Sequence, residues 1–298
     1  MGSPEFAVPT LEALAAHYSV AGVVTQPDRP AGRGGKMQPP AVKAAATRLG
    51  LSLMQPERIR NPDSILQLKA WSPDLIVVTA YGQILPQAVL DLAPHGCINV
   101  HGSLLPRWRG AAPIQASILQ GDPETGITIM KMDTGVDTGP ILSQRVIKLS
   151  PGDTAGSLFS KMAPIGAELL METLPLFLGG ELIPHAQPEK GVTYSPILKK
   201  GDGLLDFNNP AVELERRVRA MNPWPGAFFS WNGTPLKVYR ARVGFGKSPG
   251  VGCRLAVDGY PAVGTGEGIL ILEDVQPAGK KIMPGKAYFS GARDWINI

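Results

Sequence analysis

The chain has 298 residues, of which 44% are hydrophobic and 18% charged, and this length favours two domains. Its 29 basic and 25 acidic side chains leave a net charge of +4, which permits a polyanionic partner without requiring one. Its two cysteines lie far apart in the sequence, which argues against a disulfide framework or a metal site and fits a cytoplasmic location.

The first third of the chain alternates predicted helices with predicted strands. A proline followed by apolar residues at helical spacing predicts a helix over Pro9–Tyr18, and the β-branched stretch Ser19–Gln26 predicts a strand. Two more helices are predicted over Ala41–Leu49 and Asn61–Ala70. The apolar run Asp74–Tyr81 is typical of a strand buried on both faces of a parallel sheet. This alternation indicates an α/β domain.

A loop rich in proline, glycine and basic residues interrupts this pattern at Gln26–Lys43. Its composition predicts no regular structure, and a solvated, mobile connection is the simplest interpretation. A long basic loop inside a compact domain also suggests a function. It is not a phosphate-binding P-loop, because the glycine spacing differs and Met37 stands where such a loop has Ser or Thr. The basic residues of the loop are Arg29, Arg33, Lys36 and Lys43.

The densest group of potentially reactive side chains lies in Asn99–Ile114. The apolar stretch Cys97–Val100 predicts a short buried strand that ends at His101, and a helix is predicted from Pro113. Because side chains alternate across a strand, Asn99 and His101 should share one face at its carboxyl end. Ligands bind at that end in open α/β sheets. For this pair alone, turn chemistry and a satisfied histidine remain the simpler explanation.

A second polar loop follows the next predicted strand. Thr125–Met132 alternates like a half-buried strand and leads into Asp133–Leu142, which holds two aspartates and two glycines within its first seven residues. Such a loop is ordinarily a turn or a weak cation site, but the ligand spacing of a calcium-binding EF-hand is missing. A strand over Pro140–Ile147 and a long helix over Asp153–Leu174 complete this part of the chain.

The character of the sequence changes towards the C-terminus. Leu178–Lys200 loses periodicity and gathers glycine and proline, which predicts a linker. After a predicted helix over Pro210–Met221, the Asn232-Gly233 pair between β-rich runs predicts a hairpin, and further short strands favour a small β-barrel. The predicted division is therefore a domain over residues 1–177, a linker over 178–200 and a barrel domain over 201–298.

Asn99–Ile114 resembles the signature of the folate-dependent formyltransferases, an Asn-x-His-x-Ser-Leu-Leu-Pro segment that runs into an Arg-Gly-Ala-x-Pro helix start. The similarity covers nearly the whole chain from Met1 and includes Asp133–Leu142 and Asn222–Gly226. It implies a Rossmann-like formyltransferase domain with a mostly parallel sheet, followed by an OB-like barrel. It also implies that the family's first strand is missing ahead of Met1, which would leave a groove beside Ser19–Gln26.

The resemblance assigns roles to three residues. Asp137 is implied as the third catalytic residue beside Asn99 and His101, and Asp133 is the less favoured candidate. Formyl transfer to an amine passes through a tetrahedral carbon that bears an oxyanion. Asn99 could donate a hydrogen bond to this oxygen, His101 could hold a proton, and Asp137 could accept a proton from the amine. The implied folate contacts are Tyr81, Ile84, Leu85, Ser103, Leu104, Leu105 and Pro106.

The implied reaction carries the formyl group of 10-formyltetrahydrofolate, used as a cosubstrate without a metal, to initiator methionyl-tRNA for translation initiation. The catalytic motif alone does not choose between methionyl-tRNA, glycinamide ribonucleotide and nucleotide-sugar acceptors. The basic loop and Asn222–Gly226 favour methionyl-tRNA, so Arg29, Arg33, Lys36 and Lys43 are implied tRNA contacts. The enzyme is expected to act as a monomer.

Other classes of function remain open or are disfavoured. A formyl-folate hydrolase and a non-catalytic RNA-binding relative remain open. A nicotinamide dehydrogenase is disfavoured because no G-x-G-x-x-G segment joins a strand to a helix. A metal-dependent hydrolase is disfavoured because the four histidines include no i, i+4 pair. No apolar run reaches 18 residues, so no membrane contact is expected.

Overall fold

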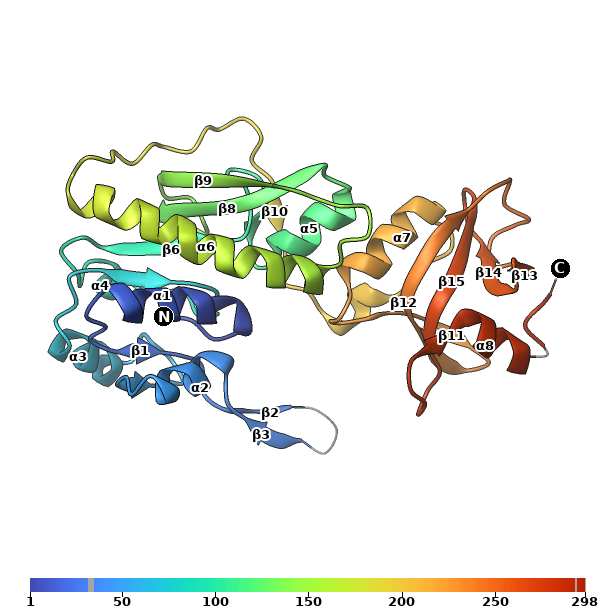
Figure 1. Cartoon of the computed structure of the whole chain (residues 1–298), viewed down its shortest axis with the longest axis horizontal. Helices are drawn as coiled ribbons and strands as arrows, with labels where there is room; N and C mark the ends of the chain where they lie inside the picture. The colour runs from blue at the N-terminus through green and yellow to red at the C-terminus, as the bar shows by residue number, and fades with distance from the viewer. Residues whose placement is uncertain (32–34, 293, 298) are drawn as a thin grey trace. The chain divides into compact units, whose positions relative to one another are not determined.

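A computed structural model describes residues 1–31, 35–292 and 294–297. The chain divides into two units (Figure 1), and each contains segments that are distant in the sequence. The first unit consists of Met1–Pro113, Glu124–Lys148 and Phe159–Ser195. The second consists of Ile114–Pro123, Leu149–Leu158 and Pro196–Ile298, and so includes two short segments from the predicted N-terminal domain.

The first unit is built on a sheet with parallel pairs and an antiparallel edge. β5 pairs in parallel with β6, and β1 pairs in parallel with β4. β8 runs antiparallel to both β6 and β9. The α/β class is therefore confirmed. The strands are β1 (Val23–Val24), β4 (Leu53–Met54), β5 (Ile76–Val78), β6 (Cys97–His101), β8 (Glu124–Lys131) and β9 (Ile141–Lys148).

Met1 and Gly2 lie between β1 and β5. The amino group of Met1 donates a hydrogen bond to the carbonyl oxygen of Val77 at 2.6 Å, and the Gly2 N–H donates to that of Val24 at 3.0 Å. Gly2 also forms a parallel bridge to Thr79. These contacts join β1 to β5. A groove of about 610 Å³ runs beside them, lined by Ser19–Val24, Trp71–Val77 and apolar side chains of α1 and α6.

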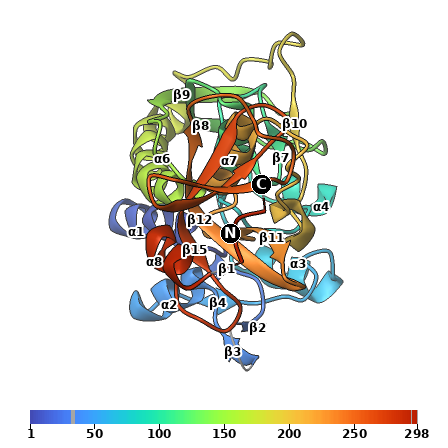
Figure 2. The ribbon, with the colours of Figure 1, turned by 90° about the vertical axis from the view of Figure 1, so that its right-hand side faces the viewer.

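Helices of the first unit that lie close to predicted positions are α1 (Val8–His17), α2 (Ala41–Arg48), α3 (Pro62–Ala70) and the long α6 (Ala155–Leu178), whose first four residues belong to the second unit. The short α4 (Gln87–Leu90) is not predicted by the local sequence pattern. In Figures 1 and 2, α6 runs along the sheet beside α1. A side-chain carbon at Gly166 would lie 3.0 Å from Val100, so this glycine lets α6 approach β6 closely.

The prediction that Gln26–Lys43 has no regular structure is wrong. Arg29–Ala31 (β2) and Lys36–Gln38 (β3) pair as an antiparallel hairpin. Asp28 anchors its base, since its carboxylate accepts hydrogen bonds from the Gln55 amide at 2.8 Å and from the Lys43 ammonium at 2.7 Å. These two bonds, that of Gln55 first, hold the pKa of Asp28 below its ordinary value of 3.8. Gln55 lies outside the loop, so the loop's own composition could not reveal the anchor.

The second unit contains an antiparallel sheet in the order β11-β12-β15-β14-β13, with β16 paired to β15. Asn232 and Gly233 form the predicted two-residue turn, and both have the positive φ angles, 48° and 73°, that it requires. The antiparallel domain is confirmed, while its closure into an OB-like barrel stays a prediction. The strands are β11 (Ala227–Trp231), β12 (Thr234–Gly244), β13 (Arg254–Val257), β14 (Tyr260–Gly264), β15 (Ile269–Gln276) and β16 (Met283–Pro284).

Among the described residues, this unit also contains α5 (Pro113–Gln120), which belongs to it from Ile114, α7 (Ala211–Ala220) and α8 (Gly285–Gly291). Neither α8 nor β14 is predicted by the local sequence pattern. The core of the unit includes the fully buried side chains of Leu214, Val218, Leu270, Leu272 and Trp295.

Candidate active site

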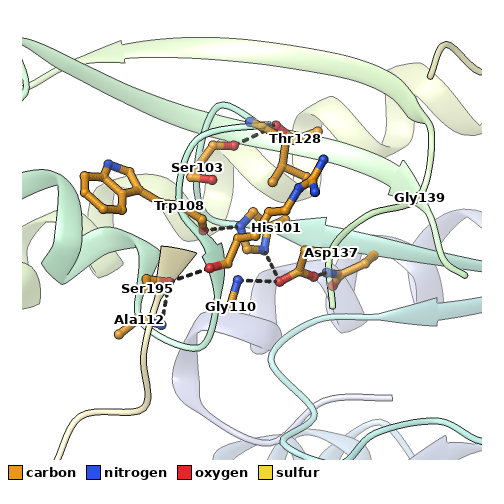
Figure 3. A network of polar contacts seen from close by, with 12 residues as sticks. His101, Ser103, Trp108, Gly110, Ala112, Thr128, Asp137, Gly139 and Ser195 are labelled. Carbon is orange, nitrogen blue, oxygen red and sulfur yellow. Dashed lines mark hydrogen bonds and ion pairs between the residues drawn. The ribbon is translucent and has the colours of Figure 1, made fainter. Parts of the chain in front are cut away.

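The structure brings Asn99, His101 and Asp137 together at the end of β6. The Asn99 amide donates a hydrogen bond to Asp137 Oδ1 at 3.2 Å, and His101 Nδ1 lies 3.6 Å from Asp137 Oδ2. Figure 3 shows the His101 ring and the Asp137 carboxylate pointing toward one another. Asn99 and His101 face the same partner because they are two residues apart on one strand. The carboxylate comes from the loop between β8 and β9.

The Asp137 carboxylate has a third partner. The backbone N–H of Gly110 donates to Asp137 Oδ2 at 2.8 Å. Asp137 itself has a φ of 53°, in the left-handed region that non-glycine residues rarely adopt. A side chain at Gly110 would collide with the carbonyl oxygen of Ser195, so glycine is required for this close approach. The site therefore holds its carboxylate with a backbone donor and an amide while one oxygen faces the imidazole.

The two ring nitrogens of His101 have different partners. Nε2 lies 3.1 Å from the carbonyl oxygen of Trp108, which can only accept a hydrogen bond, so a hydrogen bond here requires the tautomer with the hydrogen on Nε2. Nδ1 faces the Asp137 carboxylate. A proton on Nδ1 would lie between the ring and a negative charge. This arrangement suits a group that holds or passes one proton at Nδ1.

The loop after β6 is held by Ser103 and Thr128. The Ser103 hydroxyl donates to the carbonyl oxygen of Arg107, and the Thr128 hydroxyl donates to that of Ser103, both at 2.6 Å. The Leu105 N–H in turn donates to Thr128 Oγ1 at 3.1 Å. The loop includes Trp108 at a φ of 61°. Its shape sets the position of the Trp108 carbonyl group that orients His101.

The residues predicted to contact folate differ in exposure. Ile84 is 82% exposed, and Leu104 and Pro106 are half-buried. The remaining four side chains are at most 5% exposed, so any ligand contact from these positions would involve the backbone or require movement. They are Tyr81, Leu85, Ser103 and Leu105. Burial raises the pKa of the Tyr81 hydroxyl to about 12.

Asp133, the less favoured candidate, shapes the loop before Asp137. Its Oδ1 accepts hydrogen bonds from the Gly135 N–H at 3.0 Å and the Thr138 hydroxyl at 2.6 Å. These contacts are those of a turn residue. The geometry therefore favours Asp137 over Asp133 as the partner of His101.

The basic residues predicted to bind tRNA differ in their surroundings. Arg29 and Lys36 are exposed on the hairpin. Lys43 is 30% exposed and forms an ion pair with Asp28, so its charge is already engaged. Arg33 lies outside the described residues.

Sequence reasoning missed the contribution of the segment predicted as a linker. Tyr194–Ser195 (β10) pairs in parallel with Arg109–Gly110 (β7). The Ser195 hydroxyl accepts a hydrogen bond from the Ala112 N–H, and Thr193 Oγ1 accepts one from the Trp108 N–H at 2.9 Å. These contacts join residues about 80 positions apart, and no local pattern in the linker marks them.

Two features are not found in the described part of the chain. Among those residues, His, Cys, Asp and Glu do not gather in groups of three or more that could hold a metal ion. In the same ranges, none of the helices is both long and apolar enough to cross a membrane.

This α/β unit with a His–Asp–Asn cluster at a strand end agrees with the class that the sequence motifs indicate. The formyl transferase family matches residues 2–174, and the formyl transferase C-terminal domain matches residues 197–293. The chain therefore belongs to the formyl transferase family, which confirms the resemblance.

The chain is also similar to individual proteins of known sequence or structure. The methionyl-tRNA formyltransferase of Myxococcus xanthus is 49% identical over 292 residues, which cover 98% of this chain and 93% of that protein. The enzyme of the same name from Desulfotalea psychrophila is 48% identical over 297 residues, covering 98% and 92%. The N-formyltransferase of Helicobacter canadensis, solved with folinic acid and dTDP-3-aminofucose, has a TM-score of 0.67 and covers 93% of this chain and 97% of its own. Its 18% identity shows a shared fold alone.

Proposed function

We propose that this chain transfers the formyl group of 10-formyltetrahydrofolate to the amino group of initiator methionyl-tRNA, forming formylmethionyl-tRNA for translation initiation. The identities of 48% and 49% to methionyl-tRNA formyltransferases over nearly the whole chain support this acceptor. The observation that carries the chemistry is the cluster of Asn99, His101 and Asp137.

The cluster contains the groups that the reaction needs. Attack of the amine nitrogen on the formyl carbon forms a C–N bond and places negative charge on the formyl oxygen, which Asn99 would stabilise as a hydrogen-bond donor. The Asn99 amide has two hydrogens, and its bond to Asp137 uses one of them. Asp137 would accept the proton lost by the amine, directly or through water. His101 would supply a proton to the folate nitrogen as the bond from that nitrogen to the formyl carbon breaks.

The folate cosubstrate supplies the formyl group already attached to a nitrogen that can leave. Ile84, Leu104 and Pro106 offer apolar surface suited to a flat aromatic ring. They are the predicted contacts that remain candidates for direct side-chain contact.

Arg29 and Lys36, the exposed cations of the β2–β3 hairpin, are the proposed contacts to the phosphate backbone of the tRNA. Phosphate contacts give affinity that falls with salt. The chain is further proposed to act as a monomer in the cytoplasm, and sedimentation of the purified protein tests the oligomeric state.

The test is an assay that follows two products from one reaction mixture. With 10-formyltetrahydrofolate and methionyl-tRNA, formylmethionyl-tRNA is expected, with free formate only at background. Glycinamide ribonucleotide and an amino nucleotide sugar replace the tRNA in parallel reactions. Formylation of either one, with the tRNA left unmodified, would assign a different acceptor. Formate without formylated acceptor would indicate a hydrolase, and tRNA binding without folate consumption a non-catalytic protein.

A further inference from the structure

The side-chain amide of Gln187 links the loop that carries Asp137 to Arg109. Its Oε1 accepts hydrogen bonds from Arg109 Nε at 3.0 Å and Nη2 at 2.8 Å. Its Nε2 donates to the carbonyl oxygens of Asp137 and Gly139, each at 2.8 Å. Gln187 is half-buried although its immediate neighbours, Ala186 and Pro188, are exposed. Both hydrogens and both acceptor positions of the amide are therefore used.

The two sides of this link have opposite requirements. A guanidinium group can only donate hydrogen bonds, and carbonyl oxygens can only accept them. The link therefore needs an acceptor toward Arg109 and two donors toward the loop, and a glutamine amide provides both without a net charge. A glutamate at position 187 would keep the acceptor but would turn an oxygen toward two carbonyl oxygens.

The two carbonyl groups that Gln187 binds belong to Asp137 and Gly139, on either side of Thr138. One of them is therefore in the residue whose carboxylate faces His101. Asp137 has a φ of 53°, a left-handed conformation that non-glycine residues rarely adopt and that needs support from its surroundings. Gln187 binds the Asp137 carbonyl group, while the Gly110 N–H binds the Asp137 carboxylate. Gly110 follows Arg109 directly, so the Gln187 amide connects the segment of Gly110 to the loop that carries Asp137.

We propose that Gln187 is a positioning residue that sets the placement of the Asp137 carboxylate relative to His101, an inference that rests on the proposed function. It acts through Asp137 and does not need to contact either substrate.

Two substitutions of Gln187 distinguish a positioning role from action through Arg109 alone and from a purely structural role. Gln187→Met removes every hydrogen bond of the amide at similar size, and Gln187→Glu keeps an acceptor toward Arg109 and loses both donors. Both should lower kcat by about 10- to 100-fold, because a misplacement near 1 Å has effects of this size, with little change in either KM. The matched control is Thr173→Val, which removes the buried hydrogen bonds of Thr173 to Ser143 and Leu169 within the same unit.

Three results would contradict the positioning role of Gln187. Near-normal kcat in Gln187→Glu with a low kcat in Gln187→Met would show that the residue acts through Arg109 alone. Losses that follow the melting temperature and match those of Thr173→Val would show a purely structural role. In an Asp137→Asn background, Gln187→Met should cause no further loss of kcat, and a full additional loss would overturn the proposal.

A measurement without catalysis keeps this inference separate from the proposed function. The ring resonances of His101, identified by their loss in His101→Ala, are followed by NMR across a pH titration. Their titration curve should differ between Gln187→Met and the unsubstituted protein and remain unchanged in Thr173→Val. If the unsubstituted protein formylates no acceptor, the proposed function fails, and this comparison still supports or overturns the positioning role. An unchanged His101 titration in Gln187→Met would overturn it.

Discussion

The two residues whose oxygens face the ring nitrogens of His101 have unusual backbone conformations. Trp108, whose carbonyl oxygen faces Nε2, has a φ of 61°, and Asp137, whose carboxylate faces Nδ1, has a φ of 53°. A non-glycine residue in this region costs about 1–2 kcal/mol, so the surrounding hydrogen bonds must offset the strain. Thr193 supports Trp108, and Gly110 supports Asp137. The orientation of one imidazole therefore depends on several segments of the first unit.

The first prediction concerns the cluster of Asn99, His101 and Asp137. Asn99→Ala should lower kcat by about 10²–10³-fold, because it would remove the proposed donor to the developing oxyanion. His101→Ala and Asp137→Asn should each lower turnover at least as much. Rapid-mixing measurements of formylmethionyl-tRNA formation give these rates, and circular dichroism checks the fold. Retention of most activity by Asp137→Asn would return the role to Asp133.

The buried thiol of Cys97 should make the stability of the protein depend on pH. Cys97 is 1% exposed, and burial, partly opposed by the Met1 amino group, raises its pKa from 9.0 to about 12. The folded state then keeps a proton that the unfolded state releases, so this contribution to stability is complete below pH 9 and is lost as the pH rises toward 12. Urea unfolding at pH 8, 9 and 10 should show a falling free energy of unfolding.

Cys97→Ala provides the control for this measurement. The variant should be less stable at pH 8 because it loses packed volume, but its stability should fall less steeply between pH 9 and 10. Burial also raises the pKa values of Tyr81 and Tyr288 to about 12, and their ordinary value of 10.0 places their effects mostly above this window. Equal slopes for the two proteins would exclude Cys97 as the source.

At the scale of elements, the basic side chains of the β2–β3 hairpin and its base have two different environments. Arg29 and Lys36 are exposed, whereas Lys43 pairs with Asp28 at its base. The depressed pKa of Asp28 means that the carboxylate form is favoured in the folded protein. The anchor is therefore complete above the ordinary pKa of 3.8 and weakens as the pH falls below it.

The exposed cations predict a salt effect. Arg29→Ala and Lys36→Ala should each raise the KM for methionyl-tRNA, because each would remove one of the proposed phosphate contacts. The slope of log KM against log salt concentration should fall by about 0.7–0.9 per substitution, and the KM for folate should stay unchanged. Lys69→Ala, at an exposed lysine on α3, is the matched control. Equal rises in both KM values would mean that the hairpin shapes the active site.

The anchor is tested by a double-mutant cycle. If Lys43 acts by holding Asp28, then Lys43→Met and Asp28→Asn should raise the KM for methionyl-tRNA by similar factors. The double substitution should raise it no further, because both single changes break the same ion pair. A lower KM in Asp28→Asn would instead indicate that Lys43, once released, contacts the tRNA directly.

At the scale of the whole molecule, the chain passes between two units more than once, and residues near its C-terminus enter the core of the second. Trp295 is fully buried, with ring centres 4.9 Å from Trp231, 6.0 Å from Tyr288 and 6.4 Å from Phe229. Its indole N–H donates to the carbonyl oxygen of Leu255 at 3.0 Å. Trp295 therefore packs against α8 and β11 and is hydrogen-bonded to β13.

Trp295→Ala should lower the free energy of unfolding of the second unit by about 3–5 kcal/mol, as expected for truncating a buried large aromatic side chain. Scanning calorimetry and urea titration measure the loss. Trp224→Ala, in the same unit at a side chain that is 52% exposed, is the control and should change stability little. A similar effect of both substitutions would show that Trp295 is not a core residue.

Local patterns determined much of the fold. The helical spacing of Pro9–Tyr18 and the apolar run at Cys97–Val100 predicted α1 and β6 to within about a residue, because these periodicities depend on neighbouring residues alone. The Asn232-Gly233 turn was predictable for the same reason, since its two residues tolerate positive φ. Strand alternation also placed Asn99 and His101 on one face, and family motifs singled out Asp137.

Only the tertiary structure decided how the site is held. Asp137 meets Asn99 across 38 positions of sequence, and Gln187 meets Asp137 across 50 and Arg109 across 78. The hairpin in the basic loop likewise depends on Gln55, 27 positions beyond Asp28. Such contacts join segments whose own sequences show no matching pattern, because a single amide or carboxylate has no periodicity. Their partners are set by how the strands and loops pack, which the order of residues in one segment does not reveal.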